Sequence, residues 1–73
     1  MNNVDHPSHY NQGSKETIEI LKDFLTEDEF KGFLKGNVLK YMHRYKFKNG
    51  MEDLNKASWY LDKLTETESE KNL

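Results

Sequence analysis

The chain has no cysteine, one proline and one tryptophan. Without cysteine it can form neither disulfides nor a zinc site with thiolate ligands. Its three histidines, His6, His9 and His43, are too few and too scattered for a closed structural metal site. With 73 residues and 34% hydrophobic residues, the chain can bury only a thin core. Because small domains without such cross-links are usually completed by association, we expect a single domain that forms a homo-oligomer.

Long hydrophobic runs are also missing. No segment approaches the roughly 20 apolar residues that a membrane-spanning helix requires. The N-terminal sequence lacks the basic and then apolar pattern of a signal peptide. The sequence therefore predicts a cytoplasmic protein with no membrane partner.

Acidic residues are missing from the middle of the chain. The formal net charge is −2, but residues 31–48 carry six cations and no acid. These cations are Lys31, Lys35, Lys40, Arg44, Lys46 and Lys48. Such segregation can attract an anionic ligand locally. Proteins that bind duplex DNA are usually basic overall, so no duplex DNA partner is expected.

The apolar periodicity predicts an all-α fold with three helices. Residues 1–13 hold the only proline and show no periodicity, which favours an extended N-terminal arm. The helical domain is expected over residues 14–65, and its last two helices form an antiparallel hairpin. The polar and acidic residues 66–73 are expected to form a flexible tail.

Local signals mark the helix ends. Ser14 is a candidate cap for a first helix with Ile18, Leu21, Phe24 and Leu25 on its apolar side. Thr26 and Glu29 have the spacing of a capping box, which starts a second helix that ends at Asn49-Gly50. Asn49 is the expected cap of the third helix, with Glu52 at its third position. The apolar stripe of this helix is predicted at Leu54, Ala57, Ser58, Leu61 and Leu64.

One flank of the second helix carries Gly32, Gly36, Lys40, His43 and Phe47. Each glycine costs about 1 kcal/mol relative to alanine inside a helix, so a helix or a ligand is expected to approach closely there. Lys40 and Arg44 lie one and two turns beyond Gly36 and suit phosphate contacts. The alternative is that the glycines serve helix packing and the lysines form a solvated face.

Trp59 falls roughly opposite Leu54 and Leu61 in helical projection, and Tyr60 lies at the margin of the apolar stripe. Trp59 can pack under the N-terminal arm or the first helix, anchor a subunit interface, or stack on a nucleobase. We predict that Trp59 and Tyr60 form an oligomer interface.

Metal chemistry has weak support in the sequence. His6 and His9 lie around Pro7 and suit hydrogen bonding better than metal ligation. Glu16 and Glu19 lie on one side of the first helix and are weak Mg²⁺ candidates. No Gly-rich P-loop motif is present, and no catalytic triad has recognisable spacing.

Four ordered motifs carry a family resemblance over about residues 5–64. They are His6-Pro-x-His-Tyr10, Glu16-x-Ile-Glu19, Phe33-Leu-Lys-Gly-Asn37-x-x-Lys-Tyr41-x-x-Arg-Tyr45 and Lys48-x-Gly50-x-Glu-Asp-Leu54-x-Lys-Ala57-x-Trp-Tyr-Leu61. The chain resembles a family of small phage proteins of unknown function, often called nucleotide-kinase-like because a larger phage nucleotide kinase contains the same domain.

The resemblance implies an oligomer, in the host cytoplasm, that transfers phosphoryl groups between nucleotides without a P-loop. The ligand-binding residues that it implies are His6, His9, Tyr10, Gly36, Asn37, Lys40, Arg44, Lys46 and Lys48. The chain is also similar to all-α nucleotide pyrophosphohydrolases over residues 52–61. Lys56 stands where that family has a metal-binding aspartate, which disfavours Mg²⁺.

The main hypothesis is therefore a nucleotide- or phosphate-binding protein, with metal-independent phosphoryl transfer if it is an enzyme. A second hypothesis is a sponge or inhibitor that sequesters a nucleotide signal or binds a host protein. A third is a module that binds only proteins, through Trp59 and the basic face.

Overall fold

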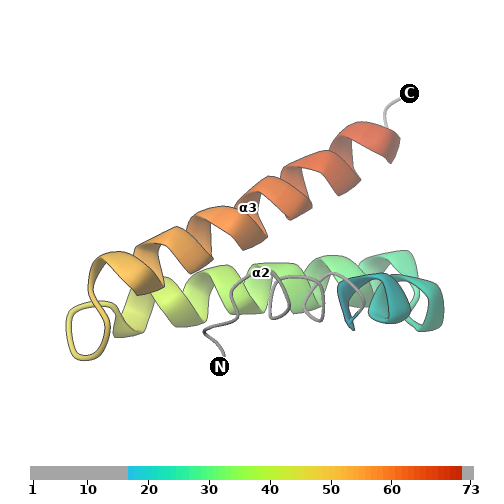
Figure 1. The fold of residues 1–73 in the computed structure, drawn as a ribbon. Coiled ribbons are helices and arrows are strands. Elements are labelled where there is room, and N and C mark those ends of the chain that lie inside the picture. The colour runs from blue at the N-terminus through green and yellow to red at the C-terminus, as the bar shows by residue number, and fades with distance from the viewer. Residues whose placement is uncertain (1–16, 72–73) are drawn as a thin grey trace, which may run out of the picture. The chain divides into compact units, whose positions relative to one another are not determined.

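The computed structural model describes residues 17–71 of the chain. Residues 17–24 are helical, α2 spans Glu27–Arg44 and α3 spans Met51–Lys71. Residues 45–50 form the turn between α2 and α3 (Figure 1). Residues 17–71 contain no strand, so the prediction of an all-α fold is confirmed. The predicted arm at residues 1–13 and the Ser14 cap lie outside the described residues.

A capping box starts α2, as the sequence predicts. The Glu29 N–H donates to Thr26 Oγ1 at 3.2 Å, and the Thr26 N–H donates to Glu29 Oε1 at 2.9 Å. These two backbone donors at the helix end are thereby satisfied. Glu27, Asp28 and Glu29 place negative charge in the first turn, where the helix dipole favours it.

The junction between α2 and α3 differs from its prediction. The helical hydrogen bonding of α2 gives way to a turn after Arg44, before the predicted stop at Asn49-Gly50. Gly50 adopts a left-handed conformation with φ of 54°, and its N–H donates to the Tyr45 carbonyl at 3.0 Å. Glycine accepts this conformation without the steric cost that a Cβ brings.

The carboxylate at the start of α3 is Asp53, so the prediction of Glu52 in this role is wrong. The Asn49 N–H donates to Asp53 Oδ2 at 3.2 Å. Asp53 is fully buried, whereas Glu52 is exposed and pairs with Lys56 one turn further on. Successive side chains of a helix point in different directions, and the side chain at position 53, rather than at position 52, points back toward residues 45–50.

The chain divides into two compact units, one up to Phe30 and one from Lys31 onward. In the first unit Ile18 and Phe30 are buried, whereas Phe24, on the predicted apolar side of the first helix, is 83% exposed. In the second unit Leu34 and Ala57 are buried. Few apolar side chains of residues 17–71 are fully buried, as the composition leads one to expect.

Within the second unit, α2 and α3 contact each other at several points along their lengths. The Phe33 and Tyr60 rings meet edge to face at 6.1 Å between centroids. Lys31 pairs with Glu68, and Arg44 pairs with Asp53. Lys31, near the start of α2, thus contacts the C-terminal part of α3. Arg44, the last residue of α2, contacts the first turn of α3. The contacts follow an antiparallel order within this unit, and the predicted hairpin as a whole stays a prediction.

The predicted boundary at residue 65 falls inside α3, which continues to Lys71. The acidic segment expected as a tail is therefore helical up to that residue. The Thr65 and Thr67 hydroxyls donate to the carbonyls of Leu61 and Lys63, both at 2.9 Å. The pair between Lys31 and Glu68 joins this segment to α2, and such tertiary contacts rather than propensity stabilise most helices in proteins.

The buried side of α3 is also rotated from its predicted position. Ala57 is buried and Leu54 and Leu64 are half-buried, but Ser58 is exposed and Leu61 is 49% exposed. Asp53 and Tyr60 occupy the inner side instead. The Asp53 carboxylate and the Tyr60 ring make the contacts that set this rotation. A stripe predicted from the spacing of aliphatic residues includes neither of them.

Candidate functional site

Three cations surround the ring of Tyr41 in α2. The Lys40 Nζ lies 4.5 Å from the ring centroid, the Lys56 Nζ 5.5 Å and the Arg44 Cζ 5.6 Å. Lys40 and Arg44 come from α2, and Lys56 comes from α3. The negative face of an aromatic ring attracts cations at such distances. The contact between the two helices therefore gathers three positive charges at one place, which we call the Tyr41 cluster.

Further aromatic rings extend the Tyr41 cluster along α3. The Tyr60 ring stacks on Tyr41 with a centroid distance of 6.0 Å and an interplanar angle of 16°. Trp59 meets Tyr60 edge to face at 5.0 Å, and the Lys63 Nζ lies 5.6 Å from the Trp59 centroid. Aromatic faces beside cations are the surfaces on which nucleobases stack in sequence-tolerant sites.

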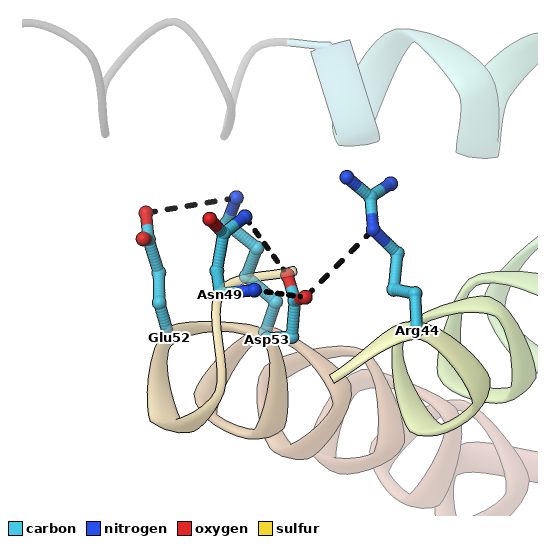
Figure 2. Close-up of polar contacts among 5 residues, drawn as sticks. Arg44, Asn49, Glu52 and Asp53 are labelled. Carbon is cyan, nitrogen blue, oxygen red and sulfur yellow. Dashed lines mark hydrogen bonds and ion pairs between the residues drawn. The ribbon is translucent and has the colours of Figure 1, made fainter. Parts of the chain in front are cut away.

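Asp53 holds one edge of Arg44. Its Oδ2 lies 3.7 Å from the Arg44 Nε, and its Oδ1 accepts from Asn49 Nδ2 at 3.5 Å. Figure 2 shows the carboxylate between the Asn49 and Arg44 side chains. Because Asp53 is fully buried and held by the turn, its charge restricts where the guanidinium can lie.

Asp53 faces only the Nε edge of the Arg44 guanidinium. Its Nε is buried without a hydrogen-bond partner, although the side chain as a whole is 34% exposed. Within residues 17–71, no hydrogen bond engages its terminal nitrogens. A guanidinium presents five donors in a plane, and its free edge matches two phosphate oxygens. Within residues 17–71, Arg44 is therefore oriented on one side by Asp53 and leaves its terminal nitrogens without a hydrogen bond.

The charges of the Tyr41 cluster are incompletely balanced. Asp53 opposes Arg44, and Glu52 opposes Lys56 at 3.8 Å. In the described part of the chain, Lys40 has no carboxylate partner. Three cations thus face two carboxylates, and the excess positive charge can attract an anion.

Metal ligands do not gather in the part of the chain that the structure describes. Among its residues, no group of three or more histidine, cysteine or acidic side chains could hold a metal ion. Glu19 is exposed, and Glu16 lies outside the described range. None of the described helices is both long enough and apolar enough to cross a membrane.

Comparison with known proteins places the chain in a family. Residues 4–62 match the family described as a protein of unknown function, DUF3310. The chain belongs to the DUF3310 family. The match covers most of the chain and includes the whole Tyr41 cluster. The predicted membership of a family of unknown function is thereby confirmed, whereas the likeness to a nucleotide kinase stays a prediction.

This DUF3310 chain is also similar to the Gene 1.7 protein of Enterobacteria phage T3. The two are 37% identical over 62 residues, which cover 78% of this chain and 38% of the relative. The chain therefore spans about two fifths of the length of this phage protein. No solved structure matches the chain.

The structure brings together only some of the predicted ligand-binding residues of this DUF3310 chain. Lys40 and Arg44 meet in the Tyr41 cluster. Asn37 donates from Nδ2 to the Phe33 carbonyl at 3.0 Å. The other predicted residues Gly36, Lys46 and Lys48 are exposed. His6, His9 and Tyr10 lie outside the described residues.

Sequence reasoning did not select Tyr41, Asp53 or Lys56 for the site of this DUF3310 chain. The spacing of Asn49 and Asp53, four residues apart around a glycine, is the signal that points to the capping carboxylate. Lys56 follows one turn later on the same side of α3. Trp59 and Tyr60, the predicted interface residues, make aromatic contacts within this chain, and their role in an oligomer stays a prediction.

Proposed function

We propose that the Tyr41 cluster binds the phosphate of a nucleotide. The observation that carries this proposal is the gathering of Lys40, Arg44 and Lys56 around one aromatic ring. Like charges so close together repel one another, and a bound phosphate removes that cost. The two carboxylates nearby offset only part of the charge.

The division of labour among the cations suits a phosphate. Arg44 offers a planar edge for two phosphate oxygens, while Asp53 keeps it oriented. Lys40, with no carboxylate partner among residues 17–71, supplies a mobile point charge. Each charge-assisted hydrogen bond contributes about 1.5–3 kcal/mol. Two of them together contribute about 3–6 kcal/mol, so the phosphate alone is expected to bind weakly, with a dissociation constant around millimolar.

Aromatic rings support a nucleotide over inorganic phosphate. Trp59 and Tyr60 lie beside the cations on α3, and Trp59 is partly exposed. A base stacked on such a ring contributes about 1–3 kcal/mol. We therefore expect nucleotides to bind more tightly than phosphate alone.

The test is binding of a nucleotide panel by isothermal titration calorimetry, with inorganic phosphate and a nucleoside as partial ligands. Lys40→Ala should weaken nucleotide binding at least tenfold, because it removes one charge-assisted contact. Lys35→Ala is the matched control, since Lys35 is also an exposed lysine of α2 but makes no contact with Tyr41. The nucleotide affinity of Lys35→Ala should stay within twofold of that of the wild type.

Two results would contradict the proposal. One is the absence of heat with every nucleotide, and the other is equal loss of affinity in Lys40→Ala and Lys35→Ala. Incubation of ATP with each nucleoside monophosphate, followed by chromatography, then separates the two forms of the hypothesis. A new diphosphate pair indicates phosphoryl transfer, whereas tight binding without product indicates sequestration.

A further inference from the structure

The side of α2 that carries Leu39, Met42 and His43 takes no part in the Tyr41 cluster. Leu39 is 58% exposed and Met42 is 50% exposed, and His43 lies next to them one turn after Leu39. The His43 ring contacts Phe47, which is itself exposed, at 5.7 Å between centroids. Positions three and four residues apart share one side of a helix. These side chains thus form a continuous apolar surface that runs into the turn.

Gly32 and Gly36 continue this surface toward the start of α2. A Cβ built at either position meets no atom of a described residue within 4 Å, and both glycines are exposed. Contacts within the described part of the chain therefore do not explain them, although each destabilises the helix by about 1 kcal/mol relative to alanine. We call Gly32, Gly36, Leu39, Met42 and His43 the outer face.

The charges along α2 indicate what covers the outer face. The first turn carries Glu27, Asp28 and Glu29, and the last turn carries His43 and Arg44, with Lys46 and Lys48 just beyond. A second α2 laid antiparallel on the first places acids opposite bases at both ends. A parallel arrangement places like charges together and is disfavoured.

The middle of α2 fits the same arrangement. The midpoint of the helix lies between Lys35 and Gly36, so a two-fold axis there brings the two glycine segments together. In this register Leu39 lies opposite Gly32 of the partner subunit, and Asp28 lies opposite His43 of the partner subunit. A large side chain then fills the space over a glycine, as in closely packed helix pairs.

We propose that the outer face of α2 binds the outer face of a second copy of this chain, with the two α2 helices antiparallel. The contact is isologous, because the same surface is used on both subunits. Lys40 borders this face, but its Nζ lies over the Tyr41 ring, so the outer face and the Tyr41 cluster use different contacts. The proposal is thus independent of nucleotide binding.

The first test is the mass of the protein as a function of concentration, by sedimentation velocity. The wild type should shift from one chain to two as its concentration rises. Gly36→Gln should remain a monomer at the same concentrations, because a long side chain stands where the two backbones meet. Its helical signal and melting temperature should equal or exceed those of the wild type under conditions where both are monomeric, since glutamine favours a helix more than glycine. Ser58→Gln, a change of similar size at an exposed position of α3, should dimerise like the wild type.

The second test is disulfide cross-linking, which is clean because the chain has no cysteine of its own. Gly36→Cys should form a disulfide-linked dimer, since the two positions meet at the axis. Asp28→Cys alone should not, because antiparallel helices separate its two copies by about 22 Å at 1.5 Å per residue. A mixture of Asp28→Cys with His43→Cys should yield the linked heterodimer.

Three results would overturn the proposal. The first is a wild type that stays monomeric at all concentrations and does not cross-link through Gly36→Cys. The second is efficient cross-linking of Asp28→Cys with itself, which indicates a parallel pair. The third is a Gly36→Gln protein that dimerises normally but has lost nucleotide binding, which assigns the glycines to a ligand.

Discussion

Replacement of Asp53 by alanine should lower the free energy of unfolding by about 2 kcal/mol. Loss of the hydrogen bond from the Asn49 N–H removes a cap contribution of about 1 kcal/mol. Loss of the carboxylate also leaves Arg44 without its ion pair. A fully buried pair costs 3–5 kcal/mol to break, but Arg44 is 34% exposed and its Nε is 3.7 Å away, so about 1 kcal/mol is reasonable here.

This loss is large for so small a domain. At 0.05–0.15 kcal/mol per residue, a chain of 73 residues is stable by about 4–11 kcal/mol. A loss of 2 kcal/mol corresponds to a fall in melting temperature of roughly 8–16 °C. Urea denaturation followed by circular dichroism measures it directly. Asp53→Asn should lose about half as much, because its amide oxygen can still accept from the turn.

The control is Glu52→Ala, which removes the neighbouring carboxylate. Glu52 is exposed and makes only a surface ion pair, so the free energy of unfolding should change by less than about 0.5 kcal/mol. A double-mutant cycle of Asp53→Ala with Arg44→Met isolates the ion pair and should give a coupling near 1 kcal/mol. Equal effects of the alanine changes at positions 52 and 53, or a coupling of zero, would refute the role assigned to Asp53.

Two further predictions concern the helix ends. Thr26→Ala should reduce the free energy of unfolding by about 1 kcal/mol, because the Glu29 N–H loses its acceptor; an unchanged urea midpoint would show that the cap contributes nothing. Gly50→Ala should cost roughly 1–2 kcal/mol, since its φ of 54° strains any residue with a Cβ, and Gly50→Asn should cost less. Equal stability of all three Gly50 proteins in thermal melts would argue against this conformation.

Features encoded by neighbouring residues were predictable from the sequence. The Thr26 and Glu29 cap depends on groups three residues apart, so its spacing alone identifies it. Lys40 and Arg44 are one turn apart on a single helix, and any helix there places them on one side. The acid-free run of residues 31–48 likewise needs no fold to be visible.

Features that depend on contacts between helices were not predictable. Asp53 reaches Arg44 only because the turn at residues 45–50 returns the chain toward α2. The extension of α3 to Lys71 is supported by Lys31, which is remote in sequence. The exposure of Phe24 shows the same difficulty, because amphipathic spacing names an apolar face without naming what covers it.

The turn between α2 and α3 also bears on the order in which the protein folds. Its polar contacts, from Gly50 to Tyr45 and from Asn49 to Asp53, join residues no more than five positions apart. They therefore close small loops, which cost little entropy and form early. The pair between Lys31 and Glu68 instead closes a much larger loop between the two helices. We expect changes in the turn to slow the folding rate, whereas changes at the far ends of the helices mainly accelerate unfolding.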